Sequence, residues 1–323
     1  MFKRLILSLA MVPAALHGAA ALAQDFPNHP IKIVVPWSPG GNVDITARTL
    51  QNALSEALGQ QVIVDNRAGA GGTIGTAAVV KSAADGYTLL LGSSGTVTSG
   101  AAVFKNLSYD PLKDLVPVGP IQYVSMVLTA APKTPAANFK EYAAYARSKP
   151  GQVSIASAGN GSSNHLALEL MARQAGLQLV HVPYKGSGPA INDLLGSQVE
   201  SMMDQMTASI EHIRNGRIKA LGVTSKVRSP LLPNVATLDE QGLAGFEAGT
   251  FTGLFAPAGT PPAVLDKLHA ALQKALANDT VRTRYQSMGV EIMHMNRPEF
   301  AAFVQADYEK WLKIAREANI VIQ

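Results

Sequence analysis

Short apolar runs alternate with amphipathic segments along most of the chain. Residues 31–35 form an apolar run typical of a buried strand, and residues 44–58 repeat apolar positions at helical spacing until Gly59. Because near-continuous apolar strands between helices are typical of buried parallel sheets, we expect a parallel sheet with helices on both faces. The same pattern predicts strands at 61–65 and 87–92 and a helix at 73–81.

A second series of alternating elements begins after Pro117. Residues 118–131 are long and extended enough to cross between domains. An apolar run at 251–255 returns the chain to the first domain, where Pro262 and Pro298 each begin a helix. Between these segments the pattern predicts helices at 139–148, 164–175, 189–195 and 207–214, and strands at 153–157, 179–182, 199–204 and 218–224.

These elements predict an α/β protein with two doubly wound lobes, a hinge and a central cleft. We place the first lobe at residues 24–123 and 252–323, and the second lobe at 124–251. In open sheets of this kind, ligands bind beyond the carboxyl ends of the strands. The strand ends that we expect to contribute contacts are 36–41, 92–96, 157–163 and 204–207.

The first 23 residues have the pattern of a cleaved export signal. Lys3 and Arg4 precede an apolar stretch at 5–15, and residues 21–23 resemble a signal peptidase site, so we predict cleavage after Ala23. The alternative, a membrane anchor, is disfavoured because the apolar stretch is too short to span a bilayer. The chain has no cysteine, so as a secreted protein it must rest on its hydrophobic core.

Composition and charge argue against some classes of function. Without the two basic residues of the signal, 25 basic and 23 acidic residues remain, a net charge of +2, and no basic block stands out. This balance argues against nucleic acid as a partner. The glycine-rich segment 69–75 is superficially like a dinucleotide loop, but it does not lie at the first strand-to-helix turn. We therefore expect a soluble monomer that uses no cofactor.

The turn after the first strand carries the clearest chemical signal. Gly40 and Gly41 leave the backbone bare, so a ligand can come close. The helix that follows presents unpaired N–H groups and the positive end of its dipole. Such a turn is a natural seat for a carboxylate or another anion.

Ordered landmarks along the whole mature chain match one family: 30–36 (PIKIVVP), 39–41 (PGG) with Asp44 and Arg48, 65–67 (DNR), 69–75 (GAGGTIG), 85–89 (DGYTL), 181–186 (HVPYKG) and 256–261 (APAGTP). On these motifs the chain resembles the substrate-binding proteins of tripartite tricarboxylate transporters, also called the Bug family of extracytoplasmic receptors. The resemblance implies a two-lobed periplasmic receptor, similar to type II periplasmic binding proteins. Such a receptor captures a small organic carboxylate and delivers it to a membrane permease.

The resemblance also implies where the solute binds. In the family, backbone amides, hydroxyls and bridging waters from both lobes hold the carboxylate. Ser38 departs from the family's aromatic-Pro-Pro-Gly-Gly loop, so we expect an additional hydroxyl and N–H near the pocket. The corresponding positions are Trp37, Ser38, Gly40, Gly41, Asn42, Ser93 and Ser94 in the first lobe, and Ser157, Ala158, Gly159, Asn160, Gly161, Ser162 and Asp204 in the second.

Three further assignments stay open. Trp37 either stacks on an aromatic or unsaturated carboxylate or packs at the rim. Asp44, a candidate contact, either accepts backbone N–H groups at the helix start or binds the amine of an amino-acid solute. His165, which borders the expected cleft and is also a candidate contact, lies four residues before Glu169. Because a zinc site needs three or four ligands, we expect no metal there.

Two other function classes remain as alternatives. A sensory subunit that presents the solute to a membrane kinase would share this fold and pocket. A periplasmic hydrolase is disfavoured, because the chain has no Gly-x-Ser-x-Gly elbow and no cysteine nucleophile. We therefore do not expect an enzyme.

Overall fold

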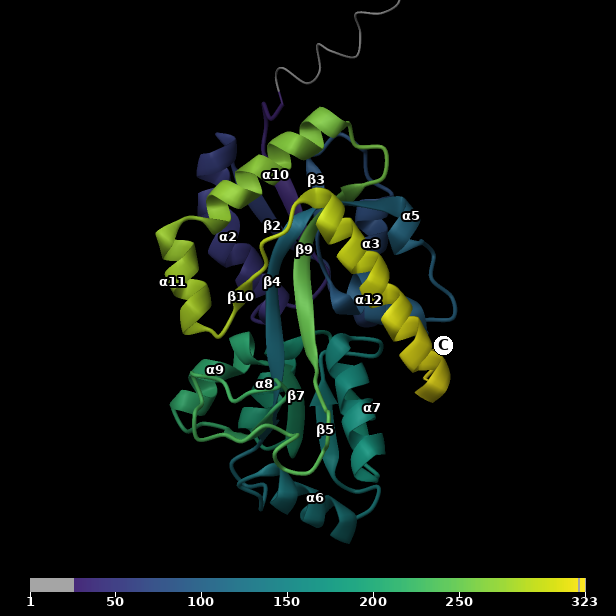
Figure 1. Cartoon of the computed structure of the whole chain (residues 1–323), viewed down its shortest axis with the longest axis vertical. Coiled ribbons are helices and arrows are strands. Elements are labelled where there is room, and N and C mark those ends of the chain that lie inside the picture. The colour runs from purple at the N-terminus through teal and green to yellow at the C-terminus, as the bar shows by residue number, and fades with distance from the viewer. Residues whose placement is uncertain (1–25, 319, 323) are drawn as a thin grey trace, which may run out of the picture.

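The computed structural model describes residues 26–318 and 320–322. Within them the chain forms two α/β lobes, one above the other in Figure 1, with long strands running between them. The predicted signal peptide and its cleavage site lie outside the described residues. Among the described residues, no helix combines the length and apolarity that a membrane crossing needs.

The first lobe is built from the two ends of the chain. Its elements are β1 (Ile31–Val35), α2 (Asn42–Leu58), β2 (Val62–Asn66), η1 (Ala70–Gly72), α3 (Thr73–Val80), β3 (Thr88–Ser93), η2 (Ser94–Thr98), α4 (Ser99–Val103), α5 (Pro111–Asp114), α10 (Pro262–Leu276), α11 (Asp279–Ser287), β10 (Glu291–Ile292) and α12 (Arg297–Ala318). Alternate residues of β1 pack into hydrophobic clusters on opposite faces of the sheet. Ile33 and Val35 pack with α2 and α10, whereas Val34 packs with Phe300 of α12. Helices therefore cover both faces of the sheet, as predicted.

The second lobe is formed by the middle of the chain. It contains α6 (Phe139–Ser148), β5 (Ser154–Ser157), α7 (Ser163–Ala175), β6 (Val180–Pro183), α8 (Ser187–Leu195), β7 (Ser201–Gln205), α9 (Met206–Arg214) and β8 (Lys219–Val223). These elements confirm the predicted alternation, with boundary differences of a few residues. α2 and α8 each begin two residues earlier than expected. α8 tolerates Pro189 in its first turn because that N–H would have no partner there.

Two long strands join the lobes (Figure 1). β4 (Leu115–Ala130) pairs with β9 (Gly249–Pro257) as far as Ser125 and then with β7 from Met126 onward. The extended crossing predicted at 118–131 is thus one continuous strand. The strand order is β2-β1-β3-β9-β4-β7-β5-β6, with β8 and β10 also paired to β4.

The sheets are mixed rather than parallel throughout, which corrects the prediction. β2, β1 and β3 are parallel, as are β7, β5 and β6, but β9 and β4 run antiparallel to their neighbours. The apolar pattern could not reveal this, because a strand buried on both faces has the same composition in either direction. The prediction also missed the π-helix η2, which continues directly from β3.

Candidate solute-binding site

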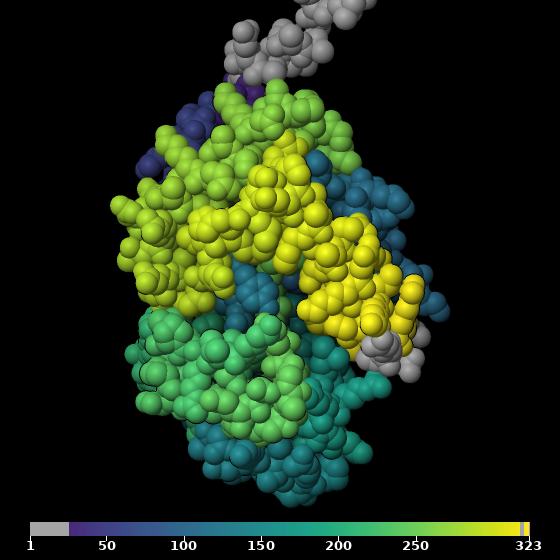
Figure 2. Space-filling view, in the orientation of Figure 1, coloured from purple at the N-terminus to yellow at the C-terminus, as the bar shows by residue number. Residues whose placement is uncertain are grey.

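A cavity lies where the two lobes meet, at the waist visible in Figure 2. Its volume is about 20 Å³, which is room for about one water. Hydrogen bonds from Ser38 to the Lys185 carbonyl cross the cleft beside it, so the lobes are closed on each other in this structure. The residues that line the cavity are Trp37, Gly41, Asn42, Val43, Ser93, Ala158, Ser163, Asn164, Gly186, Ser187, Gln205 and Thr250.

Three helix N-termini converge on this cavity, because the first residues of α2, α7 and α8 are among its lining. The N-cap positions of α2 and α8 are Gly41 and Gly186, and neither provides a side-chain cap. α7 is capped by Ser162, whose Oγ accepts a hydrogen bond from the His165 amide. The first-turn amides of these helices contribute partial positive charge to the cavity.

Two buried side-chain donors at the cavity have no acceptor among the described residues. They are Nε1 of Trp37 and Nδ2 of Asn42. The Asn42 side chain is held in place from the other end, because its Oδ1 accepts a hydrogen bond of 2.8 Å from Gln122 Nε2. A buried N–H without a partner is unfavourable, so an acceptor within reach would stabilise each of these two groups.

None of the twelve lining residues is ionisable. The two arginines near the first-lobe loops are engaged elsewhere. Arg48 pairs with Asp44 at 3.0 Å, and Arg67 pairs with Asp65 at 2.9 Å. An anion in the cavity would thus meet N–H and O–H dipoles rather than a cationic clamp.

Asp44 stabilises the first-lobe loop at residues 36–41 from outside the cavity. Its buried carboxylate accepts hydrogen bonds from the Gly40 amide at 2.9 Å and from Asn66 Nδ2 at 3.0 Å, and it pairs with Arg48. Asp44 does not line the cavity. This geometry favours the structural reading of Asp44 over contact with a solute amine.

Asp204 lies beneath the second-lobe wall of the cavity. The residue is fully buried, and its carboxylate accepts hydrogen bonds from Ser187 Oγ at 2.6 Å and Ser209 Oγ at 2.7 Å. Burial raises the pKa of Asp204 to about 6, although the hydrogen bonds from Ser187, Ser209 and Asn164 oppose this shift. Asp204 therefore fixes the Ser187 hydroxyl at the cavity instead of lining it.

Contacts across the cleft explain why other predicted residues lie outside the cavity. The Ser38 amide and hydroxyl both donate to the Lys185 carbonyl, at 3.1 and 2.9 Å, so Ser38 joins the lobes at the rim. Of the predicted contacts, five line the cavity: Trp37, Gly41, Asn42, Ser93 and Ala158. The others do not line it: Ser38, Gly40, Asp44, Ser94, Ser157, Gly159, Asn160, Gly161, Ser162, His165 and Asp204.

Sequence reasoning missed part of the second-lobe wall. Gly186 and Ser187 follow β6, yet the carboxyl end of that strand was absent from our expected strand ends. The Gly-Ser pair after an apolar strand was a signal that could have identified them. Gln205 lies in the expected strand end 204–207 and does line the cavity. Thr250 reaches the cavity through β9, and no local motif marks it.

A two-lobed α/β fold with a cavity between the lobes is typical of periplasmic solute-binding proteins. The family model described as "Tripartite tricarboxylate transporter family receptor" matches residues 46–320. The protein BugT of Bordetella pertussis is 38% identical over 318 residues, which cover 98% of both chains. The chain belongs to this receptor family, and it is a periplasmic solute-binding protein of the Bug type.

Solved structures agree with this assignment. The periplasmic binding protein BugD superimposes with a TM-score of 0.90 at 38% identity, covering 92% of this chain and all of BugD. MatC from Rhodopseudomonas palustris with bound malate gives a TM-score of 0.86 at 35% identity over 90% of this chain and 99% of MatC. An R. palustris protein with adipate gives 0.88 at 32% identity over 92% of this chain and 99% of that protein.

Asp44→Ala should lower the free energy of unfolding by roughly 1–3 kcal/mol, because the part-buried donors of Gly40 and Asn66 lose their acceptor. Asp65→Ala is the matched control, since its more exposed pair with Arg67 contributes at most about 1 kcal/mol. Denaturant unfolding measures both. A large loss of solute affinity in Asp44→Ala with intact stability would instead make Asp44 a solute contact.

Asp204→Asn should change how stability depends on pH. Burial raises the pKa of Asp204 from 3.8 to about 6, so ionisation disfavours the folded state. The stability associated with the protonated carboxyl is complete below pH 3.8 and is lost as pH rises through about 6. Acidification from pH 7 should therefore stabilise the wild type relative to Asp204→Asn, by up to about 3 kcal/mol. Parallel unfolding profiles from pH 7 to 4 would contradict this.

Proposed function

We propose that this receptor captures a small organic carboxylate, either a mono- or a dicarboxylate, and delivers it to a tripartite tricarboxylate-type membrane permease. The observation that carries the proposal is the pair of unpartnered buried donors, Trp37 Nε1 and Asn42 Nδ2, in a cavity ringed by helix N-termini. Carboxylate oxygens are strong acceptors and carry the charge that these dipoles favour.

The neutral lining supports an anion over a neutral solute. Helix N-termini and fixed N–H groups stabilise negative charge, and no lining carboxylate opposes it. A cation would be repelled by the positive ends of three helices. A neutral sugar would gain no charge stabilisation from them. The malate and adipate bound to the two R. palustris relatives are both dicarboxylates, which supports the same class of solute here.

We propose direct solute contacts from both lobes: Trp37, Gly41, Asn42 and Ser93 in the first, and Ala158, Ser163, Asn164 and Ser187 in the second. Contacts divided in this way make solute binding and lobe closure one equilibrium. The closed, loaded form then differs in shape from the open form. That difference gives the permease a means to recognise loaded receptor.

A thermal-shift screen of refolded, ligand-stripped mature protein tests this proposal. The panel comprises citrate, malate, succinate, adipate, aspartate, glutamate, benzoate and phthalate, with glucose and putrescine as neutral and cationic controls. One class of carboxylate should raise the melting temperature, with the shift growing as the logarithm of its concentration. A shift with glucose or putrescine alone, or with no compound, would contradict the carboxylate assignment.

Substitutions at Gly41 test whether the cavity is the site. A Cβ there would lie 3.4 Å from the Ser187 amide nitrogen across the cleft, and the backbone φ of −87° accepts a side chain. Gly41→Ala should weaken binding modestly, whereas Gly41→Val should abolish it, because the larger side chain occupies the closed cleft. Calorimetry with the strongest compound of the panel measures both variants, and circular dichroism checks their fold. Wild-type affinity in Gly41→Val would place the site elsewhere.

A further inference from the structure

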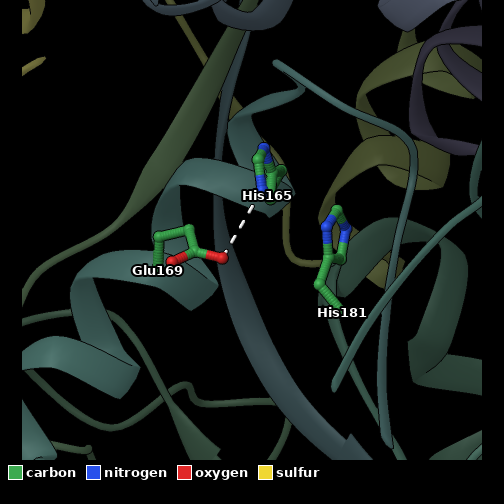
Figure 3. A group of neighbouring side chains, drawn as sticks. All are labelled: His165, Glu169 and His181. Carbon is green, nitrogen blue, oxygen red and sulfur yellow. Dashed lines mark ion pairs between the residues drawn. The ribbon is translucent and has the colours of Figure 1, made fainter. Parts of the chain in front are cut away.

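Three polar side chains gather behind the second-lobe wall, outside the solute cavity (Figure 3). His165 and Glu169 come from α7, and His181 comes from β6. One ligand-type atom of each lies within 4.8 Å of the others. The side chain of His165 is only 11% exposed. Two histidines and a glutamate are a donor set that zinc uses, so the cluster needs an explanation.

The hydrogen bonds of His165 argue against a metal. The Gly161 amide donates to His165 Nδ1 at 3.2 Å. Because a backbone amide can only donate, Nδ1 must be unprotonated, and a neutral ring then carries its proton on Nε2. Nε2 lies 3.5 Å from Glu169 Oε1, as the dashed line in Figure 3 marks. A metal on Nε2 would need that proton removed or moved to Nδ1, which would break the bond to Gly161.

His181 supports His165 from the other side. The two rings stack with centroids 4.1 Å apart and planes inclined by 12°. His181 Nε2 lies 2.6 Å from Ser157 Oγ, which in turn accepts a hydrogen bond from the Gly159 amide. Burial and the neighbouring His165 lower the pKa of His181 to about 4, so its ring is neutral at pH 7. The two stacked histidines therefore stabilise one loop at two positions: at Gly161 directly, and at Gly159 through Ser157.

That loop, residues 158–162, connects β5 to α7 and touches the first lobe. A Cβ on Gly161 would lie 2.3 Å from Phe104 Cε2, and one on Gly71 would lie 2.2 Å from the Asn160 carbonyl oxygen. Gly161 has a φ of +75°, a conformation that only glycine adopts readily. Small changes in the 158–162 loop would therefore move the N-terminus of α7 and disturb the contact between the lobes.

We propose that His165 is a positioning residue for solute capture: held by Glu169 and His181, it fixes the 158–162 loop so that the N-terminus of α7 faces the solute. This inference rests on the proposed function and adds to it a residue that does not line the cavity. The Glu169 carboxylate holds the proton on Nε2, and Nδ1 is thereby kept as the acceptor for Gly161.

Nuclear magnetic resonance of solute-free protein at pH 7 tests the positioning role without any solute. The ring nitrogens of His165 should show a protonated Nε2 and an unprotonated Nδ1. Amide exchange at Gly161 should be about tenfold faster in His165→Phe, which retains an aromatic ring against His181 but has no acceptor. A protonated Nδ1, or equal exchange rates, would overturn the proposal.

Binding experiments with malate and adipate test the functional consequence. His165→Phe should raise the Kd about tenfold. His165→Asn should stay within about twofold of the wild type, because its Oδ1 takes the place of Nδ1. His294→Phe, an exposed histidine outside the cluster, is the matched control. If the His165→Asn variant binds the solute as weakly as His165→Phe, the positioning role is wrong. It is also wrong if His165→Phe binds as tightly as the wild type.

The two experiments separate the inference from the proposed function. If neither malate nor adipate binds the wild type, the proposed solute class is in question, while the magnetic resonance result still decides the role of His165. A titration with Zn²⁺ completes the test. Unchanged ring-nitrogen resonances support the hydrogen-bonded arrangement, and saturable shifts of both histidines would replace it with a metal site.

Discussion

Buried N–H groups require acceptors, and the cavity between the lobes is built around donors that have none within the described chain. Trp37 Nε1 and Asn42 Nδ2 are buried without partners, and the N-termini of α2 and α8 lack side-chain caps. Leaving such groups unpaired is unfavourable in a closed cleft. In the function that we propose, an anion that enters the cleft would supply the missing acceptors. On this proposal, solute binding and closure have one physical cause.

The rest of the fold brings these donors together. β1, β5 and β6 all end at the cleft, and the helices that follow them start with their amides facing the same space. β4 holds the lobes in register, because it pairs with β9 in the first lobe and with β7 and β8 in the second. Glycines permit the close approach: Cβ atoms at Gly186 or Gly188 would lie within 3.0 Å of Ser38 or Pro39 backbone atoms. Supporting groups such as Asp44 and Asp204 then keep the cavity walls in place.

Local patterns predicted the parts of this arrangement that depend on local chemistry. The glycine turn before α2 and the crossing strand β4 follow from composition and length, and the alternation of strand and helix indicated the two lobes. The direction of β9 and β4 depends on tertiary pairing, so the apolar pattern could not predict it. Thr250 reaches the cavity only through the packing of its strand. His165 was expected near the cleft, but its stacking on His181 depends on an edge strand sixteen residues away.

The most direct test of the central claim observes a cavity donor while solute binds. The chain has two tryptophans, so a proton–nitrogen spectrum of the indole groups is simple to interpret. Trp37 lines the cavity, whereas Trp311 packs in a separate cluster with Val103 and Leu166. A carboxylate that binds should move the Trp37 indole resonance downfield to saturation while the Trp311 resonance stays in place. If calorimetry detects binding and the Trp37 resonance does not move, the solute does not pair with this donor, and the account of the cavity is wrong.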